Sequence, residues 1–404
     1  MKTLLLISTV FFSLTVMYKS TNAQGTWTQK ANFGATAREK AVGFSIGTKG
    51  YTGTGYDASN PNNNDFWEYD PSNDTWTQKA NYNGTARRGA VGFSIANKGY
   101  MGTGFDGVNK KTFSEYDPST NIWTPLSLFG GTARQEAVGF SIGNKGYVGT
   151  GYDGTLKNDF WEYDPISDSW TQLANFGGTA RQSAVGFSIG TKGYVGTGYD
   201  GTFKKDFWEY DPSLNQWVQK TNFGGTPRDG AVGFSIGNNG YIGTGEDGST
   251  SLLDFWEYSP TSNTWLQQTN AGGSPRNNAI GFSIGLKAYI GTGIEIINGF
   301  YFQDFWEYCD TCSVIGVNEI IINNSISIYP NPFSTHTVLQ TDNLLHNATI
   351  TVYNSQGQAV KEITQITTGQ TVILFRDNLS SGLYFLRLTG DNKNLATDKF
   401  VITD

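Results

Sequence analysis

An arginine and a glutamate recur six times along the chain, and both residue types can handle protons or bind charged substrates in enzymes. A reaction centre is asymmetric and needs each catalytic group once, so six copies favour a structural role. Because buried charges need partners, we expect these residues to pair within or between repeats, with Arg134 and Glu162 as the representative pair. The residues are Arg38, Arg87, Arg134, Arg181, Arg228 and Arg276, with Glu68, Glu115, Glu162, Glu209, Glu257 and Glu307.

Histidine is almost absent from this chain of 404 residues. His336 and His346 both lie beyond the repeats. A Ser-His-Asp triad and a histidine-ligated copper centre are therefore excluded from the repeat region. We expect no metal and no cofactor there, and the sequence nominates no catalytic residue.

The two cysteines, Cys309 and Cys312, stand three positions apart at the end of the repeats. They form a redox motif, half of a zinc site or a disulfide. Zinc needs two further ligands that the repeats do not offer, and a thioredoxin-like motif needs a helix start. We therefore expect a disulfide that pins the chain where the repeats stop, as suits an exported protein.

The spacing of the arginines gives the period of the repeat, with steps of 49, 47, 47, 47 and 48 residues. Repeats near this length form propellers or solenoids. Each complete copy has four strand signals separated by Gly, Asn, Asp and Pro. In the first, Val42, Phe44 and Ile46 alternate with small residues, as an innermost strand near a crowded axis requires. Four strands per copy make one blade of a β-propeller.

In five copies, a tyrosine and a tryptophan are separated by six residues. In this spacing residues 24 to 312 resemble the kelch repeats, which implies a kelch-type propeller, although Gly-Thr-Gly ends the second strand where kelch repeats have a glycine pair. A second tryptophan ladder is expected in the blade core, and Ser114 replaces it in the second blade, leaving that blade less well filled. The pairs are Tyr69/Trp76, Tyr116/Trp123, Tyr163/Trp170, Tyr210/Trp217 and Tyr258/Trp265, and the ladder is Trp67, Trp161, Trp208, Trp256 and Trp306.

The sixth copy, Asn278 to Tyr308, has three strand signals and no closing tryptophan, whereas the segment from Trp27 to Lys30 is a strand without a partner before it. We predict that this segment pairs near Phe305 to Tyr308 and becomes the outer strand of the sixth blade. Closure in this way removes exposed sheet edges.

Two residues after each arginine vary between copies, and so does the loop between the second and third strands. In a four-stranded blade both segments open on the same face, so the variation gathers around one channel mouth. The alternative is that these loops vary because nothing constrains them. We expect a polar ligand such as a glycan or peptide there, with Phe203, Phe300 and Tyr301 beside it. The predicted ligand-binding residues are Glu39, Lys40, Arg88, Gln135, Glu136, Gln182, Asp229 and Asn277.

Both ends of the chain carry export signals. Residues 1–23, with Lys2, an apolar run and Ala23 at the cut, are typical of a signal peptide. After a linker at 313–325, residues 326–404 resemble the C-terminal sorting domain of the type IX secretion route of some Gram-negative bacteria, through Tyr329-Pro330-Asn331-Pro332, Gly357 and Ser381-Gly382-Leu383-Tyr384. The resemblance implies that the type IX machinery is a partner, with passage through the periplasm and outer membrane.

Two function classes remain. The first is a secreted or surface propeller that binds an extracellular protein or glycan, and the second is a kelch-type carbohydrate-modifying enzyme such as a sugar epimerase. With a formal net charge of −7 and a pI near 5.0, nucleic acid is not expected as a partner. No segment is long enough for us to expect a membrane span.

Overall fold

The computed structural model describes residues 25–310, 326–341, 348–366, 371–390 and 393–404. The expected signal peptide and linker lie outside these residues. The chain divides into two compact units, Met1–Ser313 and Val314–Asp404. All of the described regular structure is β-strand, and within this part of the chain no helix has the length and apolar character needed to cross a membrane.

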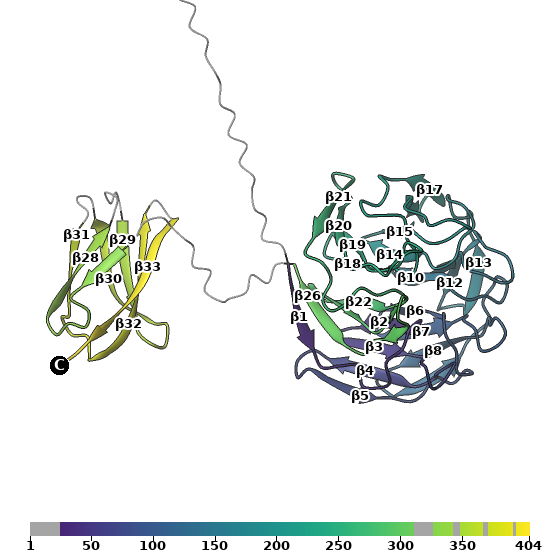
Figure 1. The fold of residues 1–404 in the computed structure, drawn as a ribbon, viewed down its shortest axis with the longest axis horizontal. Coiled ribbons are helices and arrows are strands. Elements are labelled where there is room, and N and C mark those ends of the chain that lie inside the picture. The colour runs from purple at the N-terminus through teal and green to yellow at the C-terminus, as the bar shows by residue number, and fades with distance from the viewer. Residues whose placement is uncertain (1–24, 311–325, 342–347, 367–370, 391–392) are drawn as a thin grey trace, which may run out of the picture. The chain divides into compact units, whose positions relative to one another are not determined.

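The first unit is a ring of six four-stranded antiparallel sheets, the blades, arranged around a central axis (Figure 1). The innermost strands are β2 (Val42–Ile46), β6 (Val91–Ile95), β10 (Val138–Ile142), β14 (Val185–Ile189), β18 (Val232–Ile236) and β22 (Ile280–Ile284). The second strands are β3 (Lys49–Gly53), β7 (Lys98–Gly102), β11 (Lys145–Gly149), β15 (Lys192–Gly196), β19 (Asn239–Gly243) and β23 (Lys287–Gly291).

The outer half of each blade has the same plan. The third strands are β4 (Phe66–Asp70), β8 (Phe113–Asp117), β12 (Phe160–Asp164), β16 (Phe207–Asp211), β20 (Phe255–Ser259) and β26 (Phe305–Cys309). The outermost strands of the first five blades are β5 (Thr75–Gln78), β9 (Ile122–Pro125), β13 (Ser169–Gln172), β17 (Gln216–Gln219) and β21 (Thr264–Gln268). A small hairpin, β24 (Ile294–Glu295) and β25 (Phe300–Tyr301), lies in the loop between β23 and β26.

Neighbouring blades pack through the alternation seen in the innermost strands. Val42, Phe44 and Ile46 are buried. Phe44 faces Gly99 of the next blade, where a Cβ would lie only 2.5 Å from the Phe44 ring. Glycine is required there because the ring occupies the space of a side chain. The same contact with a glycine forms at four other blade interfaces, and Ala288 takes the glycine's place at the remaining one, in the same core cluster as Phe234.

The N-terminal strand β1 (Thr26–Lys30) closes the ring, as predicted. It pairs antiparallel with β26, and Trp27 lies opposite Tyr308 in the sheet order β1-β26-β23-β22. The indole of Trp27 also packs edge-on against Phe255 of the fifth blade at 5.2 Å. The sixth blade is thus built from both ends of the repeat region.

The second unit consists of two small antiparallel sheets. One has the order β27-β28-β31 and the other β30-β29-β32-β33. A buried cluster that includes Leu339, Ile350, Leu386 and Phe400 forms its core. Its strands are β27 (Ile326–Tyr329), β28 (His336–Thr341), β29 (Ala348–Tyr353), β30 (Ala359–Ile366), β31 (Thr371–Phe375), β32 (Gly382–Gly390) and β33 (Lys393–Ile402).

Candidate functional site: the channel mouth

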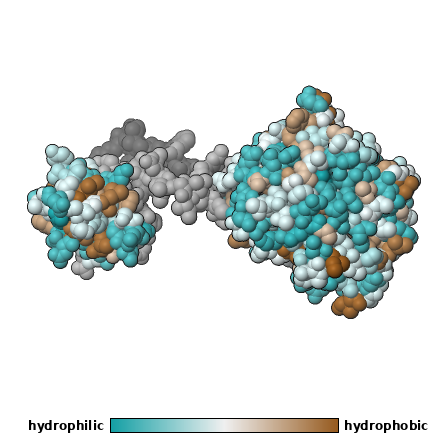
Figure 2. Space-filling view, turned by 90° about the horizontal axis from the view of Figure 1, so that it is seen from below, coloured by the Kyte–Doolittle hydropathy of each residue, from teal (hydrophilic) through white to brown (hydrophobic). Residues whose placement is uncertain are grey.

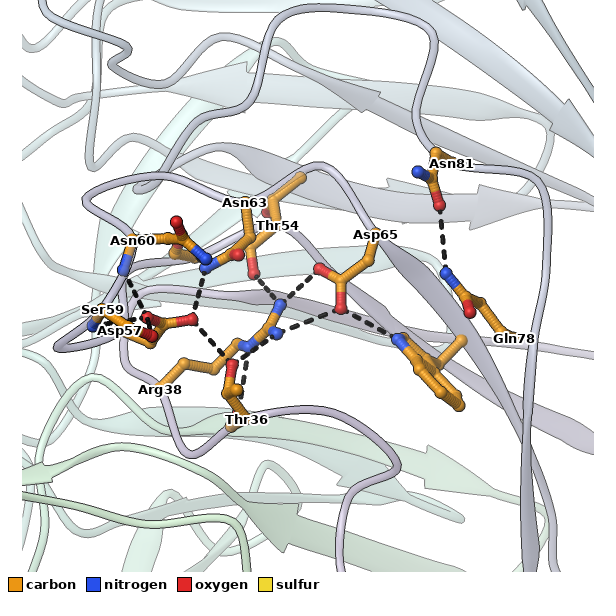
Figure 3. Close-up of polar contacts among 12 residues, drawn as sticks. Thr36, Arg38, Thr54, Asp57, Ser59, Asn60, Asn63, Asp65, Gln78 and Asn81 are labelled. Carbon is orange, nitrogen blue, oxygen red and sulfur yellow. Dashed lines mark hydrogen bonds and ion pairs between the residues drawn. The ribbon is translucent and has the colours of Figure 1, made fainter.

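The recurring arginines are buried, as expected, but their carboxylate partner is an aspartate and not the glutamate. Figure 3 shows Arg38 between Thr36, Thr54 and Asp65. Its Nη1 donates to Asp65 Oδ1 at 2.5 Å and to the Thr54 carbonyl at 2.9 Å, and its Nη2 donates to Asp65 Oδ2 at 3.0 Å. We call this arrangement an arginine fork. It recurs in four other blades, through Arg134–Asp159, Arg181–Asp206, Arg228–Asp254 and Arg276–Asp304.

The prediction that Arg134 pairs with Glu162 is therefore wrong, and strand register gives the reason. Glu162 stands directly opposite Tyr147 across β11 and β12, so their side chains share a face. The Tyr147 hydroxyl donates to Glu162 Oε2 at 2.8 Å. Burial, followed by the charge and hydrogen bond of Glu162, raises the pKa of the Tyr147 phenol. The same bond forms in Tyr51–Glu68, Tyr100–Glu115, Tyr194–Glu209 and Tyr289–Glu307.

The tryptophan ladder is half-buried and belongs to the arginine forks. In the third blade the Trp161 indole Nε1 donates to Asp159 Oδ2 at 2.8 Å. The ring lies on Gly130, where a Cβ would stand 2.6 Å from it. The fork and the ladder thus form one structural device, which accounts for their joint repetition.

A closed ring of backbone hydrogen bonds surrounds the channel mouth. It consists of one residue from each blade, and the N–H of each residue donates to the carbonyl of its counterpart in the preceding blade at 2.8 to 3.1 Å. The ring closes where the N–H of the first blade's residue donates to the carbonyl of the sixth blade's residue. Four of these residues have side chains although their φ angles, from 51° to 54°, are left-handed. We call these residues the mouth positions, and they are Lys40, Gly89, Glu136, Ser183, Gly230 and Asn278.

Below the mouth, the channel offers little chemistry. It is a cavity of about 190 Å³ lined by Ala, Val or Ile, and Gly from each innermost strand, such as Ala137, Val138 and Gly139. None of these lining side chains carries an ionisable group. Any polar chemistry on this face therefore belongs to the mouth positions and the residues around them.

The residue before each mouth position pairs with the residue that follows Gly-Thr-Gly in the same blade, in a short antiparallel bridge. We call the first set the rim positions, and they are Glu39, Arg88, Gln135, Gln182, Asp229 and Asn277. We call their partners the platform positions, and they are Tyr56, Phe105, Tyr152, Tyr199, Glu246 and Ile294. Side chains of both sets therefore surround the mouth.

The structure places seven of the eight predicted binding residues at the surface of this face, half-buried. The exception is Asn277, which is 1% exposed and donates to Glu246 Oε1 at 2.8 Å. The aromatic residues proposed to flank them are also engaged. Phe203 packs edge-on against Tyr199 at 5.2 Å, and Tyr301 lies 5.8 Å from Tyr56. Only Phe300 is well exposed, at 65%.

On the side of the first three blades, the charges at the mouth neutralise one another. Lys40 forms an ion pair with Glu136, and the Ser183 hydroxyl donates to Glu136 Oε2 at 2.8 Å. Burial disfavours both charged forms, but the pair outweighs it, so the pKa of Lys40 is raised and that of Glu136 is lowered. Arg88 is held between the Tyr56 and Phe105 rings, 5.2 Å from each centroid.

Asp229 is different because its charge is not neutralised. Burial, then the neighbouring Glu246 and Glu136, raise its pKa to about 7. Its Oδ1 is buried without a hydrogen-bond partner in the described part of the chain, and so is Asn277 Oδ1. The fifth blade thus places an acidic pair, Asp229 and Glu246, at a face that is otherwise charge-balanced.

Between the third and fourth blades, the rim and platform positions line a groove of about 400 Å³. Gln135 and Gln182 supply amides, while Tyr152 and Tyr199 supply partly exposed aromatic rings. The wall is completed by Glu136, Leu156, Asp200 and Gly201. Sequence reasoning identified the glutamines but missed the tyrosines. The residue that follows Gly-Thr-Gly varies between the six copies as the rim residues do, and this variation is the signal that could have identified the tyrosines.

The sequence predicts a disulfide between Cys309 and Cys312. Cys309 is in a disulfide, and Cys312, the other cysteine in the sequence, lies outside the described residues. Over the described ranges, no group of three or more His, Cys, Asp or Glu side chains is arranged to hold a metal ion.

The ring of six four-stranded sheets with a polar mouth defines the class of protein as a β-propeller. Among solved structures, the chain is similar to the one titled "Structure of YjhT", with a TM-score of 0.59 and 14% identity over 68% of this chain and 96% of that chain. This likeness shows the fold, which is that of a kelch-type propeller. No curated protein matches the sequence.

The C-terminal unit is assigned by its sequence. Residues 327–403 match the family model described as "Secretion system C-terminal sorting domain". The protein is therefore a kelch-like propeller with a type IX sorting domain, exported across the outer membrane to the cell surface or the extracellular space.

Proposed function

We propose that this protein is an exported binding propeller that recognises a glycan through the channel-mouth face, with the groove between the third and fourth blades as the main subsite. The observation that carries the proposal is the groove's composition. Two glutamine amides face the same hollow as two tyrosine rings. Amides both donate and accept hydrogen bonds, which suits hydroxyl groups, and aromatic faces pack against the C–H surfaces of sugar rings.

The rest of the surface favours a polar ligand over an apolar one. Figure 2 shows one side of the propeller as largely hydrophilic, with hydrophobic residues scattered singly. Exposed apolar side chains include Ile166 and Leu214, and apolar residues scattered singly over a surface need no partner. A peptide bound through an apolar patch is therefore less well supported than a glycan bound through amides and rings.

The sequence variation supports the same face. The residue type at the mouth, rim and platform positions changes from blade to blade, whereas the arginine is present in all six blades. Variation around a fixed frame is how propeller rims acquire ligand specificity. Because the tyrosine and glutamine pairs occur side by side only in the third and fourth blades, the proposed subsite occurs once.

A glycan array probed with the mature propeller tests the proposal. The double variant Gln135→Ala/Gln182→Ala is expected to lose at least about tenfold in affinity for the captured glycan, since each removes hydrogen bonds worth about 1 kcal/mol. Gln172→Ala is the matched control, because Gln172 is exposed on β13 in the same blade. No captured glycan, or equal binding by both variants, would contradict the proposal.

A second candidate function is acid–base chemistry on a sugar, and the acidic pair of the fifth blade is what favours it. A carboxyl group with a pKa of about 7 beside a second carboxylate is the kind of group that transfers protons near neutral pH. Turnover of a reducing sugar that is abolished in Asp229→Asn would establish this function. Binding without turnover would leave the propeller a binding protein.

A further inference from the structure

The second blade departs from the arginine fork at four positions at once. Thr112 stands where the other blades have aspartate, and Ser114 where they have the ladder tryptophan. Tyr82 and Asn83 stand where the third blade has Phe129 and Gly130. The arginine itself, Arg87, is retained and is 1% exposed. The second blade therefore keeps a buried cation and lacks the carboxylate that neutralises its counterparts.

The hydrogen bonds of Arg87 show what is missing. Nη1 donates to the Thr103 carbonyl at 2.7 Å and to Thr112 Oγ1 at 3.0 Å. Nε and Nη2 donate to the carbonyl and hydroxyl of Thr85 at 3.0 and 3.1 Å. No carboxylate among the described residues accepts a hydrogen bond from this guanidinium. Burial lowers the pKa of Arg87, and Tyr82 and Asp106 offset this only in part.

Asp106 does not take the place of the missing aspartate. Its carboxylate is paired with Lys110 Nζ at 2.7 Å. The corresponding Asp153 of the third blade is likewise paired with Lys157, although Arg134 has its own partner in Asp159. Asp106 is thus a feature common to these blades and leaves the charge of Arg87 without a direct counter-ion.

A second unsatisfied group lies close to Arg87. The Tyr82 hydroxyl is buried and has no hydrogen-bond partner in the described part of the chain. An atom at the Cβ position of Gly84 would lie 2.8 Å from Arg87 Nη2 and 2.9 Å from the Tyr82 carbon that bears this hydroxyl. Within the described ranges, the second blade therefore leaves two buried groups short of an acceptor, a guanidinium without a carboxylate and a phenol without a hydrogen-bond partner.

The geometry of the third blade defines the size of that acceptor. There Asp159 Oδ2 accepts from Arg134 Nη2 at 2.7 Å and from the Trp161 indole at 2.8 Å. The side chains of Thr112 and Ser114 are too short to occupy these positions. Thr112 is exposed, so its side of the fork is open to solvent. We propose that the second blade carries an anion site in which a small carboxylate from solution takes the place of the missing aspartate on Arg87.

The test compares thermal unfolding of the full chain with two variants over a series of sodium formate concentrations. Thr112→Asp supplies the carboxylate of the other blades, and is expected to raise the Tm by about 2–4 °C at low formate. Because formate stabilises only the folded protein that binds it, the difference between wild type and Thr112→Asp should shrink as formate rises. Salt effects that do not involve the site act on both proteins and cancel.

Asp206→Thr is the matched variant, since it removes the carboxylate partner of Arg181 in the fourth blade and leaves the ladder residue Trp208 in place. It should lower the Tm, and formate should recover part of the loss. A difference between wild type and Thr112→Asp that stays constant with formate, or a Thr112→Asp protein less stable than wild type, would overturn the proposal. Failure of formate to recover any of the Asp206→Thr loss would also overturn it.

Discussion

The arginine forks and the rim positions are neighbours in the chain, yet they behave in opposite ways. Arg134 is fully buried and holds Asp159, and the same fork occurs in five of the six blades. The next residue, Gln135, faces a groove, and its counterparts are acidic, basic or amide side chains. Adjacent residues therefore serve two purposes, one to hold each blade together and one to present chemistry around the mouth.

Opening the ring by deleting its closing strand is expected to have the largest effect on stability. A variant lacking residues 25–31 loses β1, its ladder with β26 and the Trp27 contacts with Phe255 and Tyr308. We expect a loss of at least about 5 kcal/mol in the free energy of unfolding, from the lost aromatic burial and the unpaired edge. Denaturant unfolding of the truncated protein measures it. Unchanged stability would show that the ring does not depend on this closure.

The second prediction separates the fork from the glutamate. Arg134→Ala leaves Asp159 without its partner, and should cost about 3–5 kcal/mol because the arginine is fully buried. Glu162→Gln keeps an acceptor for Tyr147 and should cost no more than about 1 kcal/mol. A double-mutant cycle should show coupling between Arg134 and Asp159. Stronger coupling of Arg134 to Glu162 would restore the pairing expected from the sequence.

A third prediction concerns pH and the acidic pair. The pKa of Asp229 is raised from 3.8 to about 7, so the folded protein holds a proton that the unfolded chain releases. Stability should therefore fall as pH rises from about 4 to about 7. Asp229→Asn should flatten this fall and gain about 1–2 kcal/mol at pH 8, a value reduced for partial exposure.

Asp211→Asn is the control for this prediction. Hydrogen bonds from Lys192 and Ser213 lower the pKa of Asp211 from 3.8 to about 2. The stability that Asp211 contributes is therefore lost only as the pH falls from about 4 to about 2. The Asp211 variant should keep the fall in stability between pH 4 and 7. A pH profile of Asp229→Asn that matches wild type would contradict the assignment.

Much of the fold could be predicted from the sequence because the repeat is nearly exact. The spacing of arginines gave the blades, and the unmatched strand at Trp27 gave the closure with β26. The partner of Arg134 could not be predicted, because Asp159 and Glu162 lie three residues apart and only the register decides which one faces Tyr147. The burial of Asn277 also depends on a neighbour, Glu246, that lies in the preceding blade.

Hydrogen–deuterium exchange of the mature propeller, with and without a glycan captured from the array, tests most directly whether the varied face binds the ligand. We expect slower exchange on glycan binding in residues 151–157 and 198–204, which carry Tyr152 and Tyr199 beside the groove. We expect no change in the turns at 143–146 and 190–193, which join the first two strands at their other end. Protection of those turns, with the groove unchanged, would contradict the claim that the varied face is the binding face.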